Sequence, residues 1–439
     1  YEGAFYPLLA GMTLWTVMLL GGTRAYLPPH YSARLLVLFA AWIFISALVN
    51  APGIISAGTK GRTGVEKFLL QTLLILFTIG ASLFVYHVVI RLASPLRQIR
   101  KWVLISFVVC GTYSILEIGK WLGVPLLANM QGMIDPYIRD ATNLAAYTSF
   151  ARLRSVSGEA SWFAMYCALV TPWIMSYTFT DPRSRWWSLP ALVYLLLLIT
   201  LTWSRAAYVI TALQFIVLAV GTPFLLTDPN VRARNRALGA MLVVIVAVTA
   251  LATATIFRDA GFGDRSLTTI FLSLLDTDDL SNVGRVGSQV TAMRIALDHP
   301  FFGIGFGQYG FHMMDYVPSW ALASRELAVW MSSAPDSPWA PVHGLYTRLA
   351  AELGLVGLLI WLGMWASIVR SVFLRARSST GQSPEEQMLG ITLLASIAGV
   401  LLAGFNADSL RFFGYWIVLA IAWAYVGNRE RETARMQSR

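Results

Sequence analysis

The sequence predicts an all-α membrane protein that crosses the bilayer many times. Of its 439 residues, 56% are hydrophobic and only 13% are charged, a composition that soluble globular domains do not have. The apolar residues gather in runs of roughly 17 to 25, the length that an α-helix needs to cross the hydrocarbon core. We place eleven such runs at about 5–20, 34–50, 68–90, 102–122, 160–179, 186–202, 206–226, 237–256, 344–369, 388–404 and 412–427.

Clusters of arginine and lysine indicate which ends of these runs face the cytoplasm, because positively charged short loops tend to stay there. The C-terminal tail, 428–439, is basic, and an even number of spans separates it from each of the other clusters. These clusters are 91–101, 181–185, 231–236 and 369–377. A cytoplasmic tail places Tyr1 outside, so we expect one further span before it and twelve in all. The alternative is an eleven-span chain with an external start.

The spans predict a division of the chain into four parts. Residues 1–256 hold spans one to eight, with an external loop at about 123–159. Residues 257–343 form a large external loop, residues 344–427 hold spans nine to eleven, and 428–439 form the cytoplasmic tail.

Two short helices are expected in the large external loop. The stretch "SQVTAMRIALDHP", 288–300, has apolar residues at helical spacing and is ended by Pro300. The stretch "SRELAVWMSS", 324–333, has the pattern of a second helix that lies at the membrane interface.

Several functional classes find no support in the sequence. The two cysteines, Cys110 and Cys167, both lie inside predicted spans, so neither a disulfide nor a cysteine metal site is indicated. The five histidines show no spacing typical of metal ligands. The net charge of +10 fits contact with anionic membrane lipids rather than with nucleic acid. We therefore expect no metal and no cofactor.

Arginines on the external side require an explanation, because positively charged residues in membrane proteins are usually concentrated in the cytoplasmic loops. Even insertion-based scales put the cost of a charge at membrane depth at about 2.5–3.5 kcal/mol. The guanidinium fork suits phosphate oxygens, so external arginines predict a lipid-linked pyrophosphate as ligand. The alternative is that they reach lipid head groups, which we favour for Arg152, Arg154 and Arg348. The candidates for phosphate binding are Arg205, Arg285, Arg294 and Arg411.

Two further residues are candidates for proton transfer. Glu159 immediately precedes an apolar span, where it serves either as a helix-start residue favoured by the dipole or as a proton acceptor. His343 also stands at a helix beginning, where the dipole keeps imidazole neutral and able to act as a base. The competing interpretation of a lone histidine is a structural one.

Three motifs in order resemble the O-antigen ligase and polymerase superfamily of bacterial envelope glycosyltransferases. They are "TWSRAAY" at 202–208, "GRVGSQVTAMRIALDHPFFGIGFGQYG" at 284–310 and "PVHGLYTRLAAELGLVGLLIWLG" at 341–363. The resemblance assigns the family's motif arginines to Arg205, Arg285 and Arg294, and its histidine to His343. Gly344 stands where the family usually has asparagine. The stretch "SVSGEASWFAMY", 155–166, resembles a polymerase segment, with Ala160 in place of its proline.

The glycine-rich stretch "DHPFFGIGFGQYGFHMM", 298–314, is not expected to bind a dinucleotide, because no strand precedes it. We expect Gly303, Gly305 and Gly307 to let the backbone turn tightly and lie close to the membrane surface. In that interpretation they position Arg294 over a lipid pyrophosphate.

The resemblance implies a glycosyltransferase of the membrane-embedded C type (GT-C) in a bacterial inner membrane, with its active site on the periplasmic side. The donor would be a glycan on undecaprenyl diphosphate, attacked with inversion by a sugar hydroxyl and without a metal. Either His343 or Glu159 would be the base. We favour polymerisation of a surface polysaccharide over ligation to lipid A-core. Further alternatives are a protein O-oligosaccharyltransferase and a transporter of lipid-linked glycans, and a chain-length regulator and a flippase are possible partners.

Overall fold

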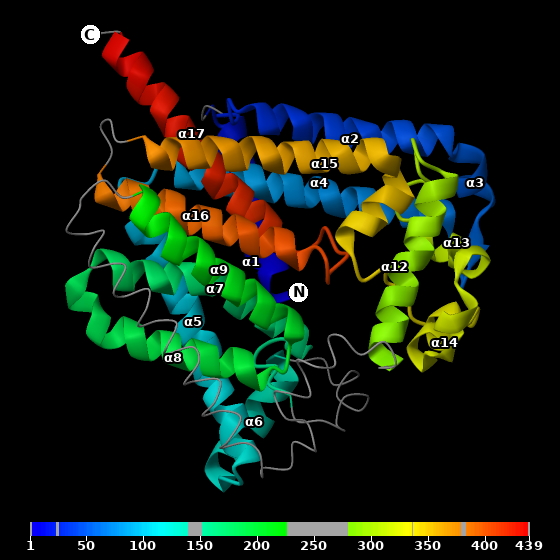
Figure 1. The fold of residues 1–439 in the computed structure, drawn as a ribbon, viewed down its shortest axis with the longest axis horizontal. Helices are drawn as coiled ribbons and strands as arrows, with labels where there is room; N and C mark the ends of the chain where they lie inside the picture. Colours follow the sequence, from blue (N-terminus) through cyan, green and yellow to red (C-terminus); the bar gives the residue numbers. More distant parts are fainter. Residues whose placement is uncertain are drawn as a thin grey trace. The chain divides into compact units, whose positions relative to one another are not determined.

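The computed structural model describes residues 2–22, 26–138, 152–225, 280–335, 337–378 and 383–437 (Figure 1). Ten of the eleven predicted spans coincide with α-helices in these ranges, and the remaining one, 237–256, lies outside them. The helices are α1 (Glu2–Leu20), α2 (Tyr31–Val49), α4 (Gly64–Val89), α5 (Pro95–Trp121), α7 (Ala160–Thr180), α8 (Arg185–Leu201), α9 (Arg205–Leu225), α15 (Leu345–Arg377), α16 (Pro384–Ala403) and α17 (Phe413–Gln437).

Six helices in the described part of the chain are long and apolar enough to cross a membrane, namely α2, α4, α5, α9, α15 and α16. Three shorter apolar helical segments accompany them, at Tyr6–Leu20, Arg185–Leu201 and Phe413–Gly427. The all-α, multi-pass class is therefore confirmed, whereas the count of eleven spans stays a prediction.

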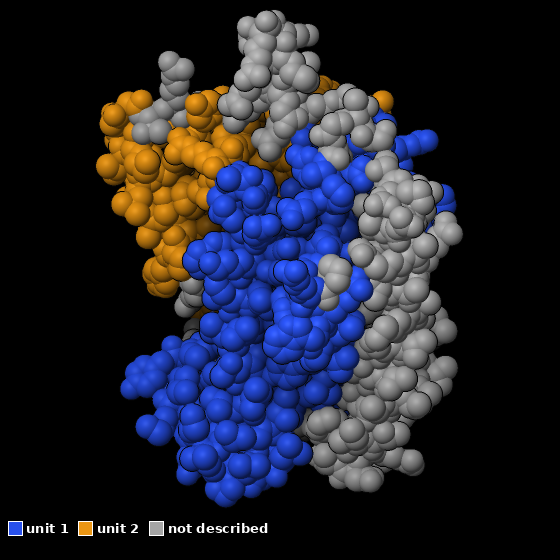
Figure 2. Space-filling model, turned by 90° about the vertical axis from the view of Figure 1, so that its left-hand side faces the viewer, with its two compact units in different colours: residues 1, 92–272, 372–400 blue, residues 2–91, 273–371, 401–439 orange. Residues whose placement is uncertain are grey.

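The chain divides into two compact units (Figure 2). Unit 1 contains residues 1, 92–272 and 372–400, and unit 2 contains residues 2–91, 273–371 and 401–439. The described part of the predicted large loop, 280–343, belongs to unit 2 together with helices from both ends of the sequence.

Unit 1 is built around α7, which packs against α5, α8 and α9. A further helix, α6 (Pro125–Ile138), lies in the predicted external loop and packs against α5. The short 3₁₀ helix η3 (Pro182–Ser184) leads into α8. Arg152, for which we favoured contact with lipid head groups, instead donates from Nε to the carbonyl oxygen of Thr202 at 2.9 Å.

Unit 2 pairs α17 with α4 and carries most of the short elements. Both helices expected in the large loop are present, and their existence is confirmed. Besides α1, α2 and most of α15, unit 2 also contains α3 (Ala51–Ser56), the hairpin strands β1 (Gly58–Thr59) and β2 (Arg62–Thr63), α12 (Leu280–Asp298), α13 (Tyr309–Tyr316), η4 (Ser319–Ala323) and α14 (Arg325–Met331).

The predicted boundaries of α12 were wrong at its start. The helix begins at Leu280, well before the expected 288, and ends at Asp298, two residues before Pro300. Proline disfavours helical backbone at the residue that precedes it, which accounts for the end of the helix. Its start was missed because "LSNVGR" has little apolar periodicity. The helix α13, which follows the glycine stretch, was not predicted.

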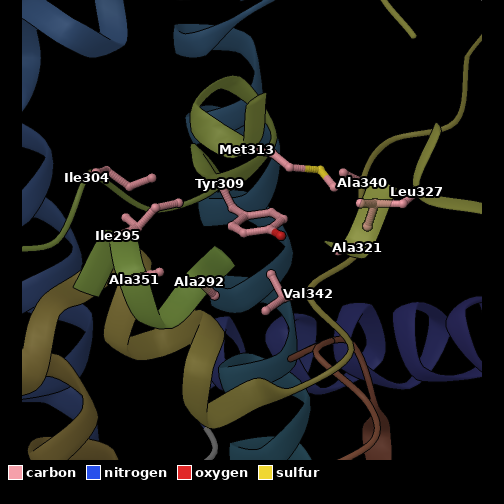
Figure 3. Packing of buried hydrophobic residues seen from close by; sticks show 10 residues of the cluster. All are labelled: Ala292, Ile295, Ile304, Tyr309, Met313, Ala321, Leu327, Ala340, Val342 and Ala351. Atoms are coloured by element: carbon pink, nitrogen blue, oxygen red, sulfur yellow. The ribbon is translucent and has the colours of Figure 1, made fainter. Parts of the chain in front are cut away.

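A compact apolar cluster holds α12, α13, η4 and α14 together (Figure 3). Tyr309 lies at its centre, and its hydroxyl donates to the Ser288 carbonyl oxygen at 3.0 Å, so the buried phenol is satisfied. This anchors the start of α13 on α12. The cluster consists of Ala292, Ile295, Ile304, Tyr309, Met313, Ala321, Leu327, Ala340, Val342 and Ala351.

Candidate active site

The glycine stretch turns sharply three times. Gly303, Gly305 and Gly307 have φ values of 64°, 100° and 82°, in the left-handed region that glycine enters without a steric penalty. All three residues are buried. Its backbone lies against the backbone of α15, and its expected position close to the membrane surface stays a prediction.

A break in α15 makes this close contact possible. Gly354 has φ 70° and interrupts the helix, so the carbonyl groups before it lose their partners in the next turn. The glycine stretch supplies replacements: Ile304 N donates to Ala351 O at 3.0 Å, and Gly305 N donates to Glu352 O at 2.9 Å. A Cβ atom at Gly303 would lie 2.4 Å from the Glu352 carbonyl carbon. The glycines thus fix the end of α15 that carries Arg348 and Glu352.

Arg348 and Glu352 form a buried ion pair one helical turn apart. Arg348 Nε lies 3.1 Å from Glu352 Oε2, and the side chains are only 13% and 2% exposed. Tyr309 N, at the start of α13, donates to Glu352 Oε1 at 3.4 Å. The interpretation of Arg348 as an arginine that reaches lipid head groups was therefore wrong. Sequence analysis did not single out Glu352, although its spacing of four from Arg348 was a visible signal.

Breaking this pair is expected to destabilise the protein strongly. Replacing Arg348 alone by methionine leaves the Glu352 carboxylate buried without its partner, at a cost of about 3–5 kcal/mol. Replacing both residues by methionine removes the uncompensated charge, so the double variant should unfold at a higher temperature than Arg348→Met. Thermal unfolding in detergent measures the difference. A double variant less stable than the single one would contradict this account of the pair.

His343 lies just before α15 with an unusual backbone. Its φ of 60° is in the left-handed region, which a non-glycine residue adopts only where its surroundings hold it. Its imidazole packs against Trp330, with ring centroids 5.1 Å apart. Its carbonyl oxygen accepts a hydrogen bond from Gln289 Nε2 at 2.9 Å. The same amide nitrogen lies 3.3 Å from where a Cβ at Gly344 would be, so Gln289 occupies space beside the position where the family usually has asparagine.

The imidazole of His343 is held in the neutral form. Burial, and after it the nearby Arg285 guanidinium, lower its pKa from 6.5 to about 4, and Asp408 partly opposes both effects. The buried Nε2 atom makes no hydrogen bond within the part of the chain that the structure describes. At neutral pH this nitrogen can therefore accept a proton from a ligand, provided that Nδ1 carries the ring proton.

Arg285 is placed beside His343 by α12. Its Nη1 donates to Asn406 Oδ1 at 3.1 Å, which ties α12 to the loop before α17. Its Nε atom is buried and has no hydrogen-bond partner among the described residues. Arg285 acts electrostatically on His343, and each of the two side chains has a buried nitrogen without a hydrogen-bond partner among the described residues, so both could bind oxygen atoms of a ligand.

Asp408, in the loop before α17, contacts both the segment before α15 and α15 itself. Sequence analysis did not single out this residue. Its Oδ2 accepts from Val342 N at 2.6 Å, and its backbone carbonyl accepts from Arg348 Nη1 at 3.0 Å. It lies far from His343 in the sequence, and no motif that we recognised contains it. Its carboxylate therefore positions the backbone just before His343.

A pocket of about 180 Å³ opens beside these residues within unit 2. Arg411, one of the predicted phosphate ligands, is exposed and lines it. The lining consists of Gln71, Tyr309, Trp339, Ala340, Pro341, Val342, Arg348, Glu352, Asp408, Ser409 and Arg411.

Arg294 and Arg285 do not lie on the same side of α12. Nine residues separate them on α12, and at about 100° per residue this places them on opposite sides of the helix. Arg294 is exposed, and its Nη1 donates to the Tyr316 carbonyl oxygen at 3.2 Å. The glycines accordingly position α15 rather than Arg294.

Arg205 and Glu159 belong to unit 1. Arg205 is the first residue of α9, and Glu159 is the N-cap residue of α7, with Oε1 accepting a hydrogen bond from the Ser161 hydroxyl. Their convergence with His343 stays a prediction. Among the described residues, no three His, Cys, Asp or Glu side chains gather as a metal site would require.

Comparison with known proteins matches the region that carries these residues. Residues 190–362 match the sequence model of the O-antigen ligase family. The resemblance to the O-antigen ligase and polymerase superfamily is confirmed. The match includes Arg205, Arg285 and His343, whereas Asp408 and Arg411 follow it. No curated protein gives a match to this chain. The match supports a role in polysaccharide assembly, with a lipid-linked glycan and an acceptor as substrates in general.

Proposed function

We propose that this protein is a glycosyltransferase that elongates a lipid-linked polysaccharide at the periplasmic face of the inner membrane. Its donor is a glycan on undecaprenyl diphosphate, and its acceptor is a sugar hydroxyl. One observation carries the proposal: among the described residues, the buried Nε2 of a neutral His343 has no hydrogen-bond partner, and nearby Arg285 has an unsatisfied Nε of its own. A base next to an anion-binding group is what this transfer needs.

The transfer is a single displacement. The acceptor hydroxyl gives its proton to His343 Nε2 while its oxygen forms a bond to the anomeric carbon of the donor. The bond from that carbon to the diphosphate oxygen breaks, and the diphosphate leaves with the electron pair. Attack opposite the leaving group inverts the anomeric configuration. The departing diphosphate needs charge stabilisation, which Arg285 supplies.

The pH dependence of the reaction should show that His343 has a different pKa in the free protein and in the substrate complex. The free imidazole has a pKa of about 4 because of burial and the nearby Arg285, so it stays neutral well below pH 7. A bound diphosphate adds negative charge near the imidazole and raises that pKa toward the working pH. As the pH falls, His343 becomes protonated and loses its function as a base. We expect kcat to fall at a higher pH than kcat/KM does, because kcat reports the complex.

Rates measured from pH 4 to pH 8 with purified protein test this order. Coincident acid limbs in kcat and kcat/KM would mean that the substrate does not contact the His343 environment.

Two observations favour different acceptors. The stretch 155–166 resembles a polymerase segment, which supports elongation of the glycan itself. The matching family model is described as O-antigen ligase, which supports lipid A-core as the second candidate acceptor.

Adding the acceptors one at a time distinguishes these candidates. Purified protein is incubated with undecaprenyl-diphosphate-linked repeat units alone, and then with added lipid A-core. A ladder of products without core identifies a polymerase, and we expect this result. Product that forms only after core is added identifies a ligase and contradicts elongation.

A further inference from the structure

The backbone around His343 is held by parts of unit 2 that are distant from it in the sequence. Besides the contact of the preceding residue with Asp408, the chain is held two residues after the histidine, where Leu345 N donates to Gly404 O at 2.7 Å. The carbonyl oxygen of His343 itself accepts a hydrogen bond from Gln289 Nε2 at 2.9 Å. Tertiary contacts therefore restrain the backbone before, at and after this residue.

Gln289 joins two separate segments through one amide group. Its Nε2 donates to His343 O at 2.9 Å and lies 3.3 Å from Phe405 O, its second acceptor. A primary amide carries two N–H donors, so both hydrogen bonds can form at once. Gln289 follows Arg285 by four residues on α12, and this spacing places both residues on the same side of the helix. One side of α12 thus carries the arginine near His343 and the glutamine that holds its carbonyl group.

The conformation of His343 requires such a restraint. Its φ of 60° lies in the left-handed region, which is unfavourable for a residue with a Cβ atom. A strained conformation of this kind persists only where the surrounding structure holds it. The carbonyl group and the imidazole are attached to the same Cα atom, so a hydrogen bond that fixes the carbonyl group also restricts the direction of the imidazole.

We propose that Gln289 is a positioning residue that keeps the His343 imidazole in its buried place near Arg285. The proposal rests on the proposed function, since it explains how the base of that reaction is held. Gln289 acts through His343 and needs no contact with the substrate. Without its two hydrogen bonds, the backbone relaxes toward ordinary angles and the imidazole leaves its buried place.

Replacing Gln289 by methionine tests this role in the transfer reaction. Methionine has a similar length and shape but no N–H donor, so both hydrogen bonds are lost. We expect kcat to fall by about 10- to 100-fold, the effect of a misplaced catalytic group, with KM unchanged. When Gln289→Met is added to His343→Asn, we expect no further loss, because no imidazole remains to be positioned.

The pKa of His343 provides a second measurement that needs no transfer reaction. Burial and the nearby Arg285 hold this pKa at about 4 in the wild type. An imidazole released from its buried place becomes hydrated, which favours the protonated form and raises the pKa. Nuclear magnetic resonance of the histidine-labelled full chain in detergent measures it, with the signal assigned through His343→Asn. In Gln289→Met we expect the pKa to rise above about 5.

The matched control is Gln98→Met, which makes the same chemical change at a partly exposed glutamine in α5 of unit 1. It should leave kcat and the pKa of His343 unchanged. Should Gln289→Met fail to fold, Gln289→Asn provides a second variant. It keeps an amide, but its side chain is one methylene shorter and should lose at least one of the two hydrogen bonds, so kcat should fall and the pKa should rise in the same directions.

An unchanged kcat or an unchanged pKa of His343 in Gln289→Met would overturn the inference. So would a further loss of transfer when the substitution is added to His343→Asn, because Gln289 would then act by another route. These results would refute the positioning role alone, since the wild type would still transfer glycan. A wild-type protein that transfers no glycan, together with a raised pKa in Gln289→Met, would refute the proposed reaction and support the positioning of His343 by Gln289.

Discussion

Replacing His343 by asparagine is expected to lower the rate of glycan transfer by about 10²–10⁴-fold, the range attributed to a positioned general base. Asparagine is the informative substitution because His343 has a φ of 60°, and asparagine tolerates the left-handed region better than alanine does. The variant should therefore keep its backbone and lose only the imidazole. Initial rates of transfer from a lipid-linked repeat unit, with purified protein in detergent, measure the loss.

The matched control is His299→Asn, which changes an exposed histidine at the end of α12. It should transfer glycan at the wild-type rate and unfold at the wild-type temperature. If His343→Asn retained wild-type transfer, His343 would be a structural residue, and Glu159 would become the remaining candidate for the base.

Gly303→Ala should be among the most destabilising single substitutions in unit 2. The new Cβ would lie 2.4 Å from the Glu352 carbonyl carbon and 2.6 Å from the Ala351 carbonyl oxygen. Both atoms are backbone, so the glycine stretch must separate from α15 and lose the hydrogen bonds to Ala351 and Glu352. Together with the strain of a φ of 64°, we expect a loss of about 3 kcal/mol or more. Thermal unfolding in detergent measures it.

Gly53→Ala serves as the control for this substitution. Gly53 lies in α3 of the same unit, and a Cβ there would have no neighbour within 4 Å, so this variant should match or slightly exceed the stability of the wild type. Equal unfolding temperatures for Gly303→Ala and Gly53→Ala would show that the glycine stretch does not hold α15 as described.

The sequence predicted those parts of the fold that depend on local patterns. Runs of apolar residues located ten helices correctly, because the length needed to cross a membrane is fixed. Pro300 marked where α12 ends to within two residues. The start of α12 and the whole of α13 had no comparable signal, because packing against the cluster around Tyr309 stabilises them rather than their own periodicity.

The candidate site could be predicted only in part. Arg285 and His343 were assigned through the resemblance, and the structure places them close enough to interact electrostatically. Asp408 was missed because its contact with Val342 joins residues that are distant in the sequence. Arg348 was misjudged because the sequence around an arginine near the start of a helix does not show whether its side chain contacts lipid or a buried carboxylate.

The separation of Arg285 from Arg294 could have been predicted from spacing alone. Nine residues between Arg285 and Arg294 place the two side chains on opposite sides of any helix that contains both. Lys67 presents the opposite case, since nothing in "GVEKFLL" indicates that this lysine is buried beside Trp339.

The most direct test of the central claim is to measure the lipid carrier together with the glycan. Purified protein is incubated with an undecaprenyl-diphosphate-linked repeat unit, and released undecaprenyl diphosphate and new glycosidic bonds are both counted by mass spectrometry. The proposed reaction predicts one diphosphate released for each bond formed, with both lost in His343→Asn. Glycan that stays on its carrier, even when the protein moves it across vesicle membranes, would contradict the claim and indicate a transporter.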